Sequence, residues 1–95
     1  MATDSRGRPP FTSRLGQPGT VPLSALRTGE RGVVVQLAGG RGLLGRMTAL
    51  GFTPGAEVTV IQNFGRGPLI ARVRDARIAL GRGEAGQIYV RRRSG

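Results

Sequence analysis

Apolar and polar residues alternate in a series of short stretches from residue 31 onward, and this pattern predicts β-strands. The five predicted strands span residues 31–38, 57–63, 69–74, 77–80 and 87–91. The side chains expected to share one face of their strand are Val33, Val35 and Leu37 in the first, Val58 and Val60 in the second, and Leu69, Ala71 and Val73 in the third. On the third strand we expect that face to point inward, with Arg72 and Arg74 on the outer side.

One stretch between the first two strands has the period of a helix instead. Leu43, Met47 and Leu50 are spaced i, i+4 and i+7, so they fall on one face of a helix that packs against the strands. Gly51 follows where a helix favours a left-handed residue, because glycine has no Cβ to clash there. We expect Phe52 to fold back against Met47, and Pro54 cannot continue the helix.

The remaining segments set the limits of the domain. Residues 1 to about 20 are rich in proline, glycine and arginine without a periodic apolar face, so they are predicted to form a disordered basic arm. Leu23 and Leu26 are expected to cover the core from a single turn. Residues 81–86 are predicted to be a loop or one helical turn, and 92–95 a tail. The domain is therefore expected at 21–91, as a small, mostly β, partly open barrel of SH3-like or OB-like type with one inserted helix.

Composition restricts the chemistry that this domain can perform. The net charge is +10, all fifteen basic residues are arginines, and the chain has no cysteine and no histidine. Disulfides, thiolate metal sites and the commonest general base are therefore absent. The five carboxylates are scattered along the chain, so we expect no enzyme, no catalytic residue, no cofactor and no metal site. No apolar run is long enough to cross a bilayer and no secretory signal is present, so a cytoplasmic location is expected.

The residues alone suggest two further binding functions. Residues 40–45 read G-x-G-x-x-G, which can hold a pyrophosphate at a helix N-terminus, but only within a βαβ crossover followed by an acidic residue about twenty positions on. We interpret these glycines as a tight strand-to-helix turn. Nucleic-acid binding is the stronger alternative, because Arg72, Arg74 and Arg77 can form a basic outer face, yet few aromatic side chains are available to stack on bases.

The spacing of these features closely resembles the FeoA family of ferrous-iron-transport A proteins over about residues 21–91. Its most specific part is Leu50-Gly51-Phe52-Thr53-Pro54-Gly55 followed by an alternating strand, and Ile78-Ala79-Leu80 with Ala85 and Ile88 supports it. The resemblance implies a five-stranded SH3-like barrel with one inserted short helix. It also implies a small cytoplasmic accessory protein of bacterial Fe(II) uptake. The same fold occurs as the C-terminal domain of regulators related to the diphtheria-toxin repressor, so a stand-alone regulatory module is an alternative.

The partner that the resemblance implies is the cytoplasmic GTPase domain of the membrane permease FeoB. We expect contact with that protein rather than with a small-molecule substrate or a nucleic acid, and contact with the membrane only through the partner. Nothing in the charge pattern opposes weak self-association. The candidate partner-binding residues are Arg46, Leu50, Gly51, Phe52, Pro54, Gly55, Arg72 and Arg74. The alternative for the Leu50–Gly55 segment is that these residues only shape the fold.

Overall fold

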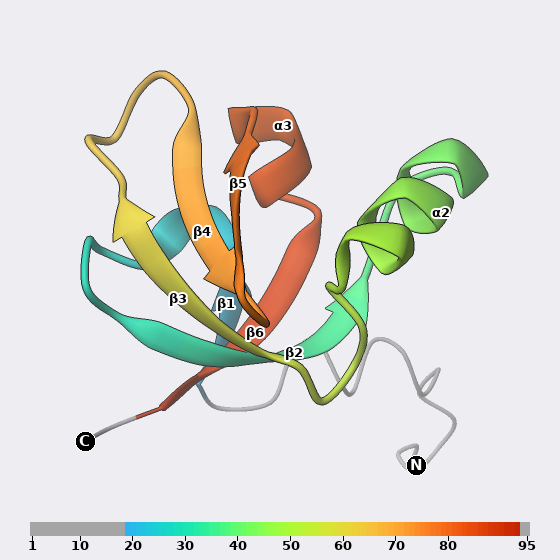
Figure 1. The fold of residues 1–95 in the computed structure, drawn as a ribbon, viewed down its shortest axis with the longest axis horizontal. Helices are drawn as coiled ribbons and strands as arrows, with labels where there is room; N and C mark the ends of the chain where they lie inside the picture. Colours follow the sequence, from blue (N-terminus) through green and yellow to red (C-terminus); the bar gives the residue numbers. More distant parts are fainter. Residues whose placement is uncertain (1–18, 94–95) are drawn as a thin grey trace, which may run out of the picture.

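The structure is a computed structural model that describes residues 19–93, and these residues form one curled antiparallel sheet with a helix inserted between two strands (Figure 1). The strands are β1 (Thr20–Pro22), β2 (Arg31–Leu37), β3 (Glu57–Gln62), β4 (Leu69–Val73), β5 (Ala76–Leu80) and β6 (Ile88–Arg93). Their order across the sheet is β1-β6-β2-β3-β4-β5. The prediction of a mostly β fold with one short helix is confirmed, with six strands in place of five.

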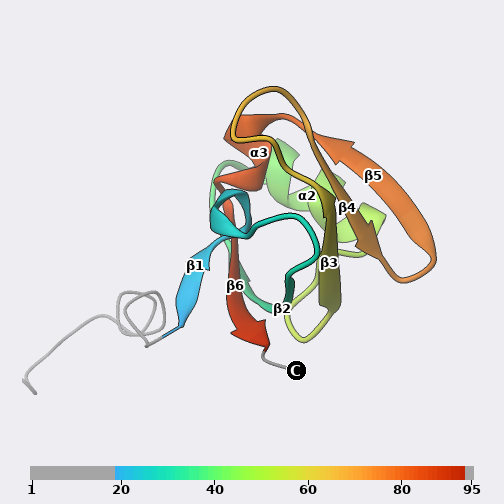
Figure 2. The ribbon, with the colours of Figure 1, turned by 90° about the vertical axis from the view of Figure 1, so that its left-hand side faces the viewer.

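The core fills the concave side of this sheet, and the period-two pattern explains its composition. Val58 and Val60 of β3 are buried, so the prediction that they share one face of the strand is confirmed, and that face is the inner one. Leu69, Ala71 and Val73 of β4 are buried as well, which confirms the inner face predicted for that strand. Leu23, the first residue of the short turn η1 (Leu23–Ala25), and Leu26, which follows the turn, are fully buried as well. Figure 2 shows the cyan segment that contains η1 between β6 and β3.

The face predicted for β2 is wrong in its first half. Val34 is buried, whereas Val33 and Val35 are only half-buried. The register against β6 shifts between Val34 and Gln36, which marks a β-bulge. A bulge adds one residue to the strand and reverses which side chains face inward. Val34 before the bulge and Leu37 after it therefore both pack against the core, although they are three residues apart.

The first and last strands along the chain extend beyond the predicted domain. β1 was not predicted, because three residues that include Pro22 have no readable period; its residues pair with β6, where Val21 lies opposite Val90. β6 continues through Arg92 and Arg93, where the sequence predicts a tail. The predicted arm lies almost wholly in residues 1–18, outside the described residues.

Helix α2 (Arg41–Leu50) ends as the sequence predicts. Gly51 has a left-handed φ of 105°, and the N–H of Phe52 donates to the carbonyl of Met47 at 2.9 Å. Met47 and Phe52 are buried, but Leu50 is 37% exposed, so its predicted packing is wrong. At about 100° per residue Leu50 lies about 60° around the helix from Met47, and the contact with the barrel is too narrow to include it.

Two further predictions about the helical segments can be compared with the structure. β2 and β3, which flank α2, pair antiparallel to each other, so the glycines of residues 40–45 do not belong to a parallel βαβ unit. Gly40 directly precedes α2 in the predicted strand-to-helix turn, whereas Gly42 and Gly45 lie inside the helix. Residues 81–86, predicted as a loop or one helical turn, contain the short helix α3 (Arg82–Ala85). No helix within residues 19–93 is long and apolar enough to span a bilayer.

Candidate partner-binding groove

An open groove of about 560 Å³ lies on the outer side of the sheet, beside the loop that joins α2 to β3. It is lined by Arg31, Thr53, Pro54, Gly55, Ala56, Glu57, Thr59, Arg72 and Arg74. Four of the eight predicted partner-binding residues therefore meet in one surface, namely Pro54, Gly55, Arg72 and Arg74. They come from two segments that are about twenty residues apart in the sequence and that adjoin only because β3 pairs with β4.

The floor of the groove is held rigidly by backbone hydrogen bonds. The N–H of Gly55 donates to the carbonyl of Val34 at 2.8 Å, and the N–H of Val34 donates to the carbonyl of Ala56 at 2.8 Å. A further bond runs from the N–H of Ala56 to the carbonyl of Thr53. The loop is thus attached to the middle of β2, and these bonds hold Pro54 and Gly55 in place at the surface.

Arg74 occupies one end of the groove in an unusual backbone conformation. It lies in the two-residue connection between β4 and β5 and has a φ of 56°, which is uncommon for a residue with a side chain. Its stem lies over Gly51: a Cβ built on Gly51 would be 3.2 Å from Nε and 3.3 Å from Cδ of Arg74. The helix-ending glycine therefore also makes room for an arginine of the groove.

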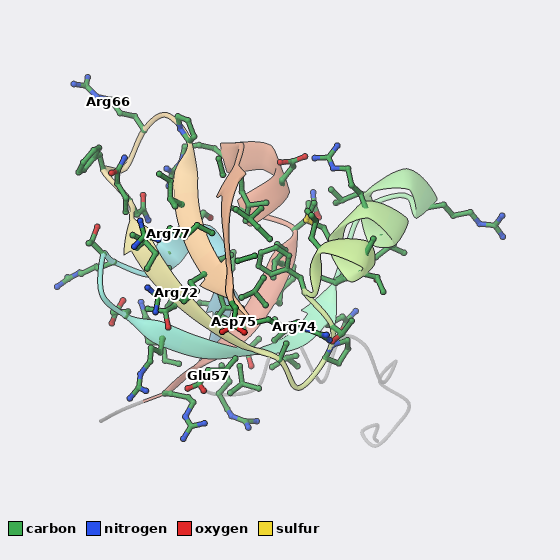
Figure 3. All side chains as sticks on the ribbon, viewed as in Figure 1. Glu57, Arg66, Arg72, Arg74, Asp75 and Arg77 are labelled. Atoms are coloured by element: carbon green, nitrogen blue, oxygen red, sulfur yellow. The ribbon has the colours of Figure 1, made fainter. Side chains whose placement is uncertain are left out.

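The charges of the groove are unevenly compensated. Glu57 Oε2 lies 3.8 Å from Arg31 Nη1 and 3.6 Å from Nη1 of Arg93, so one carboxylate forms ion pairs with two arginines. Arg72 and Arg74 are exposed and make no ion pair among the described residues. Figure 3 shows Arg72 near Arg77 and well apart from Arg74, with Glu57 below them.

The other four predicted residues do not line the groove. Arg46 of α2 forms an ion pair with Glu84, whose carboxylate also accepts a hydrogen bond from the N–H of Gly81 at 3.1 Å. Phe52 is fully buried in the core and has no surface to offer a partner. Leu50 is partly exposed on α2, and Gly51 lies beneath Arg74.

Sequence reasoning missed the residues that complete the groove on the side of β2 and β3. Arg31, Glu57 and Thr59 line it, and their proximity depends on strand register: Arg31 lies opposite Thr59, and Thr59 opposite Arg72. That the side chain of Thr59 points outward could be predicted, because Val58 and Val60 on either side of it point inward. The register of β2 was not, because nothing in the sequence locates the pairing of strands separated by a helix.

This arrangement is suited to binding anionic groups. Arginine guanidinium groups bind carboxylate and phosphate groups through paired N–H donors, and the exposed Arg72 and Arg74 are available for that. Within residues 19–93 no three acidic, histidine or cysteine side chains gather to form a metal site.

Comparison with known proteins places this chain in the class of small SH3-like β-barrel modules. The family model described as the FeoA domain matches residues 21–92, and the chain belongs to the FeoA domain family. The putative Fe(2+) transport protein A of Methanocaldococcus jannaschii is 35% identical over 69 residues, which cover 73% of this chain and 83% of that protein.

Solved structures agree with this assignment. A crystal structure of the iron uptake regulatory protein FeoA matches with a TM-score of 0.74 at 38% identity, covering 78% of this chain and 99% of that chain. Stenotrophomonas maltophilia FeoA, solved with zinc and described as an SH3 domain protein, matches with a TM-score of 0.64 at 30% identity, covering 72% and 86% of the two chains. A manganese-dependent transcriptional repressor shares only the fold, with a TM-score of 0.75 at 21% identity, over 90% of this chain and 48% of that one.

Proposed function

We propose that this protein is a cytoplasmic, non-catalytic accessory factor of Fe(II) uptake that contacts the GTPase domain of a FeoB-type permease. Its membership of the FeoA domain family supports a role in ferrous iron transport. The relative from Stenotrophomonas maltophilia is described as a possible activating factor of ferrous iron transport. The choice of the GTPase domain as the partner is our inference.

The observation that supports a contact function most directly is the groove itself. Its floor is fixed to β2 by backbone hydrogen bonds, and exposed Arg72 and Arg74 stand at its rim without an ion-pair partner among residues 19–93. A rigid surface loses little conformational entropy when a partner binds, because its groups are already ordered. Pro54, Gly55, Arg72 and Arg74 remain our candidates for the contact.

Leu50 and Arg46 belong to a second, less favoured part of the proposed contact surface. Both lie on α2, and Arg46 is already paired with Glu84. Breaking that pair to bind a partner would cost part of the energy gained. Phe52 and Gly51 are proposed to act only through the fold, because one is buried and the other is covered by Arg74.

The proposal is tested by titrating the full chain into the isolated cytoplasmic GTPase domain of the permease from the same organism. The titration is made with GDP and with a non-hydrolysable GTP analogue, at low and at physiological salt, and GTP hydrolysis is measured in parallel. We expect saturable binding in at least one nucleotide state, weakened by salt because the groove is basic. Absence of binding in every condition, together with unchanged hydrolysis, would contradict the proposal.

A further inference from the structure

The strand registers align arginines in one row across the outer face of the sheet. Arg93 of β6 lies opposite Arg31 of β2, Arg31 opposite Thr59 of β3, Thr59 opposite Arg72 of β4, and Arg72 opposite Arg77 of β5. Neighbouring strands are about 4.8 Å apart, so these five positions span about 19 Å. Four of the five positions in a single cross-section of the sheet are therefore cationic.

The two ends of this row differ in how their charge is compensated. At the β6–β2 end, Glu57 lies within 3.8 Å of Arg31 and 3.6 Å of Arg93. At the β4–β5 end, Arg72 and Arg77 face each other directly, both are exposed, and neither makes an ion pair among the described residues. Figure 3 shows the two labelled side chains close together on the same side of the sheet.

Two like charges directly opposite each other weaken an antiparallel pair. The folded protein therefore gains nothing from having arginine at both positions, and the acidic residue nearest in the sequence, Asp75, makes no ion pair with either of them. An anion bound between Arg72 and Arg77 would compensate both charges at once. The adjoining groove, which Arg72 also lines, offers space for the rest of such a ligand.

We infer that Arg72 and Arg77, together with the groove, bind an acidic segment of a protein partner, with a carboxylate held between the two guanidinium groups. This inference rests on the proposed function as far as the identity of the partner is concerned. The chemistry of the surface itself, a concave groove with a compact cationic rim, does not depend on it.

Three features favour a protein segment over a polyanion such as single-stranded nucleic acid. The cationic row is interrupted by Thr59 and partly neutralised at its β6–β2 end by Glu57, so a phosphate backbone that followed the whole row would meet a carboxylate at that end. No aromatic side chain lines the groove, although stacking on aromatic residues supplies much of the affinity for single strands. The exposed aromatic Phe64 lies instead in the loop between β3 and β4.

An anionic membrane surface fits less well than a protein segment. The groove is an open hollow that includes the loop residues Pro54 and Gly55, and no large apolar side chain lines it for insertion into a bilayer. The two large exposed apolar residues in the described part of the chain, Leu50 and Phe64, lie on different elements and do not border the groove.

The inference is tested with two probes and two charge-matched variants of the full chain. The probes are the permease GTPase domain and a ten-residue peptide of alternating glutamate and glycine. The variants are R72E/R77E, which reverses the pair, and R41E/R66E, which makes the same change of four charge units at exposed positions outside the groove. Figure 3 shows Arg66 extending away from the body of the protein.

We expect R72E/R77E to weaken binding of both probes about tenfold or more at low salt, and R41E/R66E to change it much less, because only the first variant alters the contact. If the wild type binds the GTPase domain and R72E/R77E binds it equally well, the inference is overturned while the proposed function stands. If the GTPase domain does not bind but the peptide binds through Arg72 and Arg77, the proposed function fails while the acidic-segment site stands.

Two further outcomes also overturn the inference. One is that both variants weaken binding of the peptide equally, which would show a general effect of net charge. The other is that a twenty-residue oligothymidylate, or vesicles with 30% phosphatidylglycerol, bind through Arg72 and Arg77 more tightly than the peptide does at equal charge concentration. Circular dichroism of both variants, expected to match the wild type, separates loss of binding from loss of the fold.

Discussion

The side chain of Arg74 lies across Gly51, so that a Cβ at position 51 would be 3.2 Å from Nε of Arg74. This relationship joins the end of α2 to the β4–β5 connection, two places that are more than twenty residues apart in the sequence. Glycine is thus favoured at position 51 by its left-handed φ of 105° and also by the close approach of the Arg74 side chain.

Replacement of Gly51 by alanine is therefore expected to destabilise the protein by about 1 to 2 kcal/mol, the cost of a left-handed conformation for a residue with a side chain. Urea unfolding followed by circular dichroism measures this change. Gly45→Ala is the matched control, because Gly45 lies inside α2 with open space around it and alanine favours the helix by about 0.5 to 1 kcal/mol. Equal effects of the two substitutions would contradict the role given to Gly51.

The repulsion between Arg72 and Arg77 can be measured with a double-mutant cycle. Arg72→Glu and Arg77→Glu each replace a like-charge pair by an opposite-charge pair, so each should stabilise the protein by about 0.2 to 1 kcal/mol. The double variant restores a like-charge pair and should lose this gain. The cycle isolates the pair from the change in net charge. Additive effects in thermal unfolding would show that the two side chains do not interact.

The unequal roles of two helix residues give a further prediction. Met47→Ala removes a buried side chain and should cost about 2 to 5 kcal/mol, a large fraction of the stability of so small a domain. Leu50→Ala, at a position that is 37% exposed, should cost about 1 kcal/mol or less. Chemical denaturation of the two variants side by side distinguishes them. If Leu50→Ala lowered the free energy of unfolding more than Met47→Ala does, the result would contradict this account and support the packing of Leu50 predicted from the helical period.

The loop between β3 and β4 depends on Asn63. Its Nδ2 donates to the carbonyls of Leu26 at 2.6 Å and Ser24 at 3.1 Å, and its Oδ1 accepts from Nη1 of Arg82 at 3.1 Å. Asn63→Ala removes the Nδ2 donor from both carbonyls, and the carbonyl of Ser24 then keeps only its 3.4 Å hydrogen bond from Nη2 of Arg82. The substitution should therefore cost about 1 to 3 kcal/mol. Arg66→Ala in the same loop is exposed and should change stability by less than about 0.5 kcal/mol. Indistinguishable melting temperatures for the two variants would show that these hydrogen bonds add nothing.

Much of this fold can be predicted from the local pattern of residues, and β3 and β2 show where such prediction succeeds and where it fails. The alternation around Val58 and Val60 predicts the inner face of β3, because register with β4 preserves the period there. The same reasoning fails for Val33 and Val35, since a bulge between Val34 and Gln36 changes the phase of β2. A bulge depends on the pairing with β6 and leaves no local mark in the sequence.

The candidate site was predictable only in part for a related reason. Pro54 and Gly55 follow a helix stop, and Arg72 lies in an outward position of β4, so their exposure could be inferred from the sequence. The row from Arg31 to Arg77 could not, because it depends on three successive registers across the sheet. The helix end at Leu50–Phe52 was predicted correctly, but the exposure of its side chains was not. Phe52 is buried and Leu50 is partly exposed, because the backbone signal of a helix end does not determine which side chain a partner can reach.

The most direct test of the central claim maps the contact on the protein itself. Backbone amide resonances of the isotope-labelled full chain are followed by NMR while the unlabelled GTPase domain of the permease is added. We predict that shifts and line broadening concentrate in residues 53–59 and 72–77, around the groove and the opposed arginines. Perturbations centred instead on β1 or on the outer side of α2, or none at saturating partner, would contradict it.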